Sequence, residues 1–241
     1  MTRAPDTAPR SYPFVVPAAG AVDLWFAREP ALGPPAVLDQ GERERAAAFI
    51  RDADRDRYVG AHVMLRHLLG RYLAVPPEAV RLARDRCPCC GADGHGRPIV
   101  APGTYREPLH FSLSHAGSLV ALAVGSDPVG ADVEAWPRPE AVRDLVPALH
   151  PAEQDELAEE AGGEGEVAAF SRLWTRKEAY LKGLGTGLGR APHLDYVGTR
   201  RPGPEDWSLA DVPVPEGYSA AVALRHPGRI DPRVTWLDAP P

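Results

Sequence analysis

Three carboxylates and one lysine in the middle of the chain have the types and spacing to perform chemistry on phosphates. Asp132 and Glu134 belong to the segment 129–134, whose alternating pattern puts both on one face of a predicted strand. Two carboxylates on one face repel each other unless a cation lies between them. Glu178 and Lys182 lie four residues apart in a helical pattern, so they are neighbours on its surface. Oxygen ligands suit Mg²⁺ and a lysine suits a phosphate, so the grouping indicates metal-assisted phosphoryl transfer.

Two elements must position these side chains. The strand is predicted to turn Val129, Ala131 and Val133 to the side opposite the carboxylates. The helix is predicted from an apolar stripe at helical spacing, formed by Phe170, Leu173, Trp174, Leu181 and Leu184. Gly183 and Gly185 are expected to end this helix. Either motif alone is typical of a solvated strand or an ordinary helix surface, so the prediction depends on their joint occurrence.

The rest of the chain reads as alternating helices and strands. Helices are expected over 41–50, from residue 55 to the break at Val75-Pro76, over 139–149 and over 151–160. Strands are expected over 21–27, 109–115, 119–124, 194–197, 218–224 and 234–237. The first 20 residues read as a loosely held tail and residues 84–108 as loop, with a flexible break at 161–165.

A weak internal repeat divides the chain into two parts. Each part has a short Glu-rich helix, a break and a longer helix that ends near Leu-Leu-Gly (68–70) or Gly-Leu-Gly (183–185). Each also has a buried strand, 119–124 in one and 220–224 in the other. We therefore expect an α+β pseudodimer whose halves are residues 1–127 and 128–241. Each half would be a small, mainly antiparallel sheet packed with helices, with the active site at the seam.

Composition restricts the possible partners and compartment. The chain has 241 residues and a net charge of −6, which argues against a general nucleic-acid binder. No apolar run approaches the about 20 residues of a membrane-spanning helix. Residues 1–10 lack the apolar stretch of a signal peptide. We expect a monomer in the cytoplasm that contacts neither membrane nor nucleic acid.

Three cysteines form one cluster at residues 87–90. Cys87 and Cys90 have Cys-x-x-Cys spacing, and His95 follows them. A structural zinc ion takes four ligands, commonly from two such pairs, and the sequence has no second pair. Reduced thiols are the expected state in a cytoplasmic protein, and we expect no catalytic role for them.

Four motifs together resemble those of the 4′-phosphopantetheinyl transferases of the Sfp type, the large pseudodimeric class. They are Gly96-Arg97-Pro98, Phe111-Ser112-Leu113-Ser114-His115, Val129-Gly130-Ala131-Asp132-Val133-Glu134 and Trp174-Thr175-Arg176-Lys177-Glu178-Ala179-Tyr180-Leu181-Lys182. They occur in the order of the family and span residues 96–185; the less specific region from Phe49 to Arg66 extends the match. The chain departs from the family at three positions: Ser112 replaces Asn, Ala116 replaces Ser and Arg97 replaces Lys.

The resemblance implies that coenzyme A donates its phosphopantetheine arm to a serine of an apo acyl or peptidyl carrier protein, with release of 3′,5′-ADP. It assigns Asp132, Glu134 and Glu178 to Mg²⁺ at the pyrophosphate, and the catalytic roles to Glu178 and Lys182. Glu178 is the candidate acceptor of the serine proton, although a metal-bound carboxylate is a weak base. The residues implied in contact with coenzyme A are Arg45, Arg57, Arg97, Ser114, His115 and Lys182.

Two other functions stay open from the residues alone. A different Mg²⁺-dependent phosphoryl enzyme, such as a hydrolase, could use the same three carboxylates, but no nucleophile motif is visible. A catalytically idle pseudodimer could bind carrier proteins without modifying them. Coenzyme A binding distinguishes the first from a transferase, and turnover distinguishes the second.

Overall fold

The structure is a computed structural model that describes residues 14–28, 35–94, 96–103, 105, 108–160 and 164–237. Four sequence expectations lie wholly or partly outside these residues: the tail up to residue 13, His95, the loop 84–108 at residues 104, 106 and 107, and the break 161–165 at residues 161–163. The described residues form helices and small sheets, which confirms the α+β class. Among them, no helix is both long enough and apolar enough to cross a membrane.

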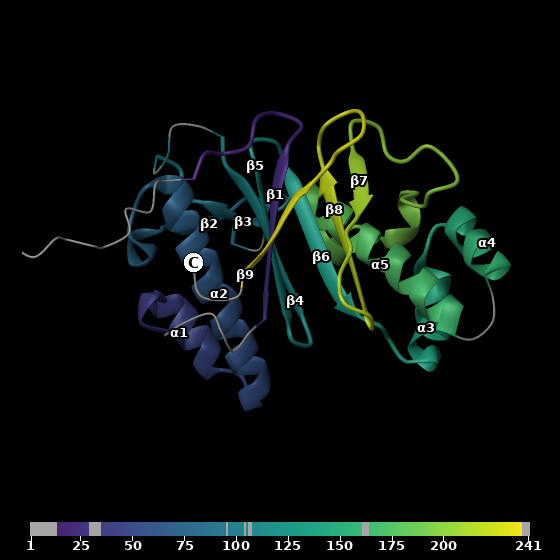
Figure 1. The fold of residues 1–241 in the computed structure, drawn as a ribbon, viewed down its shortest axis with the longest axis horizontal. Coiled ribbons are helices and arrows are strands. Elements are labelled where there is room, and N and C mark those ends of the chain that lie inside the picture. The colour runs from purple at the N-terminus through teal and green to yellow at the C-terminus, as the bar shows by residue number, and fades with distance from the viewer. Residues whose placement is uncertain are drawn as a thin grey trace, which may run out of the picture.

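The larger sheet has four strands. Its strands lie in the order β4-β5-β1-β9, with bounds β1 Val22–Arg28, β4 His110–Ala116, β5 Leu119–Gly125 and β9 Arg233–Leu237. β5 pairs antiparallel with both β4 and β1. β9 comes from the end of the chain, crosses to this sheet and pairs parallel with β1 (Figure 1).

The second sheet has three antiparallel strands. Its order is β6-β8-β7, with bounds β6 Val129–Ala135, β7 Ser208–Asp211 and β8 Tyr218–Leu224. A separate pair joins β2 (Leu82–Arg84) to β3 (Pro98–Val100). Alternate residues of β1, β5, β6 and β8 pack into one apolar core between the two larger sheets; members include Leu24, Ala121, Val133 and Val222. This core leaves the opposite face of each sheet for a helix.

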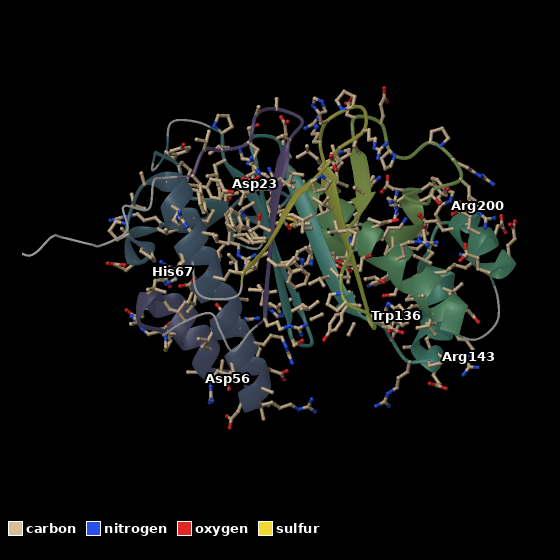
Figure 2. All side chains as sticks on the ribbon, viewed as in Figure 1. Asp23, Asp56, His67, Trp136, Arg143 and Arg200 are labelled. Carbon is tan, nitrogen blue, oxygen red and sulfur yellow. The ribbon has the colours of Figure 1, made fainter. Side chains whose placement is uncertain are left out.

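Two long helices cover those opposite faces (Figure 1). α2 (Asp52–Leu73) packs its apolar side on β1, β4 and β5. α5 (Glu164–Leu184) packs on β8 of the three-stranded sheet through Ala179, Tyr180 and Leu181. The remaining α-helices are short: α1 (Gln40–Ala47), α3 (Pro139–Leu145) and α4 (Pro151–Glu159). Charged side chains such as Asp56, Arg143 and Arg200 point outward from this arrangement (Figure 2).

Most elements match the sequence expectations, and several details differ. The flexible break expected over 161–165 is shorter than predicted, because residues 164 and 165 already belong to α5. Residues 194–197 form no strand; a 3-10 turn covers Pro192–Leu194, where proline fixes φ, and Arg190 then pairs with Asp195. The edge strand β7 was not expected, and the expected loop 84–108 contains β3. Gly183 was expected to end the helix but lies inside α5, which ends at Leu184, before Gly185 with its φ of +81°. A Cβ atom at Gly183 would lie 2.5 Å from the ring of Trp207, so the position requires glycine for close packing.

Candidate functional site

A close approach between α5 and β6 creates the site. A Cβ atom at Gly130 would lie 1.9 Å from the carbonyl oxygen of Ala179 and 2.4 Å from the nitrogen of Gly183. Only glycine allows two backbones to come this close. Because strand side chains alternate, Asp132 and Glu134 share the face of Gly130 and point toward α5. The predicted alternation of the strand is therefore confirmed, with its valines in the core between the sheets.

Asp132 is the most connected carboxylate of the site. Its Oδ1 accepts a hydrogen bond from the hydroxyl of Ser114 at 2.8 Å and one from Nζ of Lys182 at 2.6 Å. Its Oδ2 is also buried and has no hydrogen-bond partner among the described residues. Asp132 does not face solvent, as a carboxylate on an ordinary half-buried strand would: it is 1% exposed, because α5 covers its face of the strand. A buried carboxylate oxygen without a donor is costly unless a cation approaches it.

Two serines of β4 connect the edges of the two sheets. The backbone N–H of Ala131 donates to the hydroxyl of Ser112 at 3.0 Å, and that of Val133 donates to the hydroxyl of Ser114 at 3.4 Å. Lys182 also donates to Ser114 at 3.0 Å. Sequence reasoning missed the contact of Ser112, although polar residues alternating with apolar ones in a strand give its signal. This serine replaces the asparagine of the family, and its hydroxyl accepts the hydrogen bond of the backbone N–H of Ala131 at the edge of β6.

The other two carboxylates carry raised pKa values. Burial, with the negative charges of Asp132 and Glu178, raises the pKa of Glu134 to about 7, although Lys182 opposes the shift. Burial and Asp132 likewise raise the pKa of Glu178. The three carboxylates therefore lie close enough to repel one another. In the part of the chain that is described, no three His, Cys, Asp or Glu side chains converge tightly enough to hold a metal as they stand. The donor set still fits a hard cation, which prefers carboxylate oxygens.

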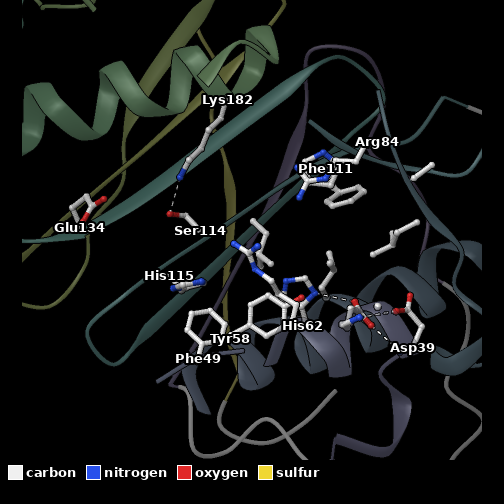
Figure 3. Close-up of a pocket in the computed structure, with 18 residues that line it drawn as sticks. Asp39, Phe49, Tyr58, His62, Arg84, Phe111, Ser114, His115, Glu134 and Lys182 are labelled. Atoms are coloured by element: carbon white, nitrogen blue, oxygen red, sulfur yellow. Dashed lines mark hydrogen bonds and ion pairs between the residues drawn. The ribbon is translucent and has the colours of Figure 1, made fainter. Parts of the chain in front are cut away.

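A cavity of about 820 Å³ opens beside this cluster (Figure 3). Glu134, Ser114 and Lys182 form one end, and His115 lies between them and the helices. The far walls come from α1, α2 and β2; they include Asp39, Gly41, Glu42, Arg45, Phe49, Tyr58, His62 and Arg84. A neighbouring cavity of about 240 Å³ also reaches Lys182. The positive charge of Lys182, which lines both cavities, suits a ligand that carries phosphate.

The sequence-predicted phosphate contacts divide between these cavities. Arg45, Ser114 and His115 line the larger one, and Arg97 lines the smaller one. Arg97 donates to the carbonyl oxygen of Gly183 at 3.0 Å, near the end of α5, and its Nε lies 3.3 Å from Asp85. Sequence reasoning missed the aromatic wall of the larger cavity, where His62 stacks on Tyr58 with ring centroids 4.1 Å apart.

Arg57 lies apart from the lining of both cavities. Its Nε donates to the carbonyl oxygen of Gly117, just after β4, and its guanidinium pairs with Asp54. It is still near enough to affect His115: surrounding protein atoms lower the pKa of His115, and the positive charges of Arg57 and Lys182 lower it further. His115 therefore favours the neutral form, although its side chain reaches solvent.

The cysteine cluster lies away from the carboxylates, in the turn between β2 and β3. Within the described part of the chain none of the three cysteines forms a disulfide; Cys87 is buried, and Cys89 and Cys90 are exposed. The turn packs near the segment after α5, since a Cβ at Gly189 would lie 3.5 Å from the sulfur of Cys89.

Comparisons with known proteins match most of the chain to one family. The family model described as 4′-phosphopantetheinyl transferase, N-terminal, matches residues 33–127, and the model described as the 4′-phosphopantetheinyl transferase superfamily matches residues 128–212. The 4′-phosphopantetheinyl transferase HetI of a Nostoc species is 28% identical, over 78% of this chain and 79% of HetI. A phosphopantetheinyl transferase of a Thraustochytrium species is 30% identical, over 70% of this chain and 62% of that protein. The 4′-phosphopantetheinyl transferase Sfp of Bacillus subtilis is 24% identical, over 77% of this chain and 81% of Sfp.

The motif residues and these matches lead to one identification. The two family models follow each other without a gap, and the second contains Asp132, Glu134, Glu178 and Lys182. The chain belongs to the 4′-phosphopantetheinyl transferase superfamily and is a transferase.

Proposed function

We propose that this transferase moves the 4′-phosphopantetheine arm of coenzyme A to a serine hydroxyl of an apo acyl or peptidyl carrier protein. The serine oxygen forms a bond to the phosphorus that bears the arm, the bond to the other phosphate breaks, and 3′,5′-ADP leaves. One observation carries the proposal: three carboxylates lie beside Lys182, and Glu134 and Lys182 line the end of a cavity of about 820 Å³. The cavity is large enough for a coenzyme-sized ligand.

Asp132, Glu134 and Glu178 would hold Mg²⁺ in this proposal. The unpartnered Oδ2 of Asp132 and the raised pKa values of Glu134 and Glu178 support it, because a bound cation relieves both. When bound, the ion supplies positive charge that offsets the charge developing on the pyrophosphate. Lys182 now pairs with Asp132, and its side chain is 31% exposed, so it is free to turn toward phosphate.

Glu178 and Lys182 take the catalytic roles in this proposal. The raised pKa of Glu178 makes it a better proton acceptor than an ordinary surface glutamate. Glu178 therefore receives the proton of the carrier serine, directly or through water. Lys182 donates to the pyrophosphate and stabilises the leaving 3′,5′-ADP. Ser114, which donates to Asp132, keeps that carboxylate oriented when Lys182 turns away.

Five side chains would bind coenzyme A around this centre. Arg45 and His115 would contact its phosphates from the walls of the larger cavity, and Arg97 from the smaller one. Ser114 would donate a hydrogen bond at the cavity end. Arg57 would reach the phosphates from the start of α2, since it already influences the charge of His115. Neutral His115 would act as a hydrogen-bond donor.

We also propose that residues 1–127 and 128–241 are two similar halves related by a pseudo-twofold, with the site at their seam. The two family models adjoin between residues 127 and 128. Each long helix is followed by a residue with positive φ, Ala74 at 55° and Gly185 at 81°. The last strand, β9, crosses to the sheet of the first half. We further propose that the protein acts as a monomer in the cytoplasm, without nucleic acid or membrane.

The test uses coenzyme A, Mg²⁺ and a panel of apo carrier proteins. Release of 3′,5′-ADP that requires both Mg²⁺ and an apo carrier supports the transferase. Release without a carrier would indicate a hydrolase. Coenzyme A and carrier binding without any release would indicate an idle binding protein. In either of those two cases the proposed reaction is wrong.

A further inference from the structure

Arg66 of α2 is a fully buried cation whose charged partners lie on and beside α1. Its side chain is 0% exposed, and its Nε donates to Oε2 of Glu42 at 2.5 Å. The guanidinium also pairs with Asp39, the residue that caps the start of α1. It donates further to the carbonyl oxygens of Pro77, at 3.3 Å, and Val80, at 3.0 Å. One buried side chain thus joins α1 to α2 and to the turn that follows α2.

Apart from these contacts, α1 buries few side chains against the rest of the protein. Glu42 and Ala46 are the buried residues of this helix, so a methyl group and a carboxylate make up its inward face. Yet the helix supplies Gly41, Glu42 and Arg45 to the wall of the large cavity. A helix with so small an apolar face owes its position mainly to its polar contacts.

Glu42 also connects α1 to the aromatic wall. Its Oε1 lies 2.9 Å from Nδ1 of His62, which stacks on Tyr58 (Figure 3). Burial raises the pKa of Glu42, but hydrogen bonds from His62, the Asp39 backbone and Arg66 outweigh burial and lower it. The carboxylate is therefore ionised and fully engaged within the protein.

We propose that Arg66 and Glu42 are a positioning pair: they hold α1 against α2 so that Arg45 faces the coenzyme A cavity. This inference rests on the proposed function, because it assigns the α1 wall to coenzyme A binding. Neither residue needs to touch coenzyme A. Loss of the pair releases α1 and lowers the fraction of molecules in which the cavity is complete.

The second half contains a matched pair that serves as an internal control. Glu153 and Lys177 are 24 residues apart, as are Glu42 and Arg66. Both glutamates are the third residue of a short helix and complete a capping box. Lys177 Nζ lies 2.9 Å from Glu153, and both side chains are 0% exposed. Neither is among the described residues that line the two cavities at Lys182.

The sign of the effect separates positioning from direct contact. Coenzyme A is a polyanion, and Glu42 lines its proposed cavity. If the carboxylate acted on the ligand directly, its neutralisation would remove a repulsion and strengthen binding. A positioning role predicts weaker binding, because α1 then spends less time in place.

The experiment compares Glu42→Gln, Asp39→Asn and Glu153→Gln with the wild type. Coenzyme A affinity is measured by calorimetry, and hydrogen exchange is followed at the amides of residues 40–47. We expect Glu42→Gln to raise the dissociation constant about tenfold, as when α1 is docked about a tenth of the time. We expect Asp39→Asn to raise it less, because asparagine keeps the helix cap and Asp39 is 51% exposed. Both should speed exchange in α1.

Glu153→Gln should lower the melting temperature, because it leaves Lys177 buried without its charged partner, but it should not change coenzyme A affinity. Unchanged or tighter binding in Glu42→Gln, or unchanged α1 exchange in both α1 variants, would overturn the inference. If Glu42→Gln does not fold, Asp39→Asn decides alone. If the wild type itself binds no coenzyme A, the proposed function fails, and α1 exchange still tests the anchoring.

Discussion

Asp132 is the residue where most contacts of the site meet, and its removal should affect activity far more than stability. Asp132→Asn keeps the size of the side chain but loses the charge that pairs with Lys182. We expect transfer at saturating Mg²⁺ to fall about a hundredfold or more, as when one electrostatic group of an active site is lost. The free energy of unfolding should change by only about 1 kcal/mol, since Lys182 can turn to solvent. Near-wild-type turnover at saturating Mg²⁺ would remove Asp132 from the metal site.

Substitutions of Glu178 and Lys182 should affect the single-turnover rate and the coenzyme A affinity to different extents. Glu178→Gln keeps shape but loses charge and basicity, so the single-turnover rate should fall about 10²–10⁴-fold while coenzyme A affinity falls less. Lys182→Ala should weaken affinity and turnover together, because its phosphate contact exists in the ground state as well. Single-turnover transfer and calorimetry measure the two quantities. A Glu178→Gln variant that loses affinity but keeps its rate would make Glu178 a binding residue only.

Glu134 should make the metal-free protein less stable as pH rises. Its pKa is about 7 in the folded state against 4.5 for the ordinary side chain. Between these values the folded protein keeps a proton that the unfolded chain has released, so stability falls as pH rises through this window. Glu134→Gln lacks this titration. In EDTA, the melting temperature of the variant minus that of the wild type should increase as pH rises from about 4.5 to about 7. If the melting temperatures of the two proteins differ by the same amount at every pH in that range, Glu134 is not buried among like charges.

At the scale of elements, the contact between β6 and α5 sets the site. A methyl group at Gly130 would collide with the backbone of α5, whereas one at Gly165, in the first turn of α5, meets nothing within 4 Å. We expect Gly130→Ala to cost about 1–3 kcal/mol and to lower turnover by moving Lys182 away from Asp132. Gly165→Ala should be neutral or slightly stabilising. Chemical denaturation and transfer assays compare the two. Equal behaviour of both variants would mean that the close approach is unimportant.

The sequence could predict these elements because each has a strong local pattern. Alternation along 129–134 assigned the faces of β6 correctly, and the apolar stripe located α5. The burial of Asp132 was not predictable, because it depends on how closely α5 packs on β6. Gly130 and Gly183, which are far apart in the sequence, allow this close approach. Residues 194–197 look like a strand but pair with no strand among the described residues; a 3-10 turn at Pro192–Leu194 and the ion pair of Arg190 with Asp195 fix them instead.

At the scale of the whole molecule, two sheets share one core and α2 and α5 cover their outer faces. The site lies where β4 and β6, the edge strands of the two sheets, meet through Ser112 and Ser114. This meeting and the parallel pairing of β9 with β1 join residues far apart in the sequence. No local periodicity encodes such contacts, so the sequence predicted two halves but not how they connect.

Intact-mass spectrometry of an apo carrier protein tests the central claim most directly. The carrier is incubated with this protein, coenzyme A and Mg²⁺, beside a carrier whose acceptor serine is changed to alanine. We predict that the intact carrier gains the mass of one phosphopantetheine arm, that the alanine carrier gains nothing, and that EDTA or the Asp132→Asn variant prevents the gain. No mass gain on any acyl or peptidyl carrier in a broad panel, with folded protein that binds coenzyme A, would contradict the claim.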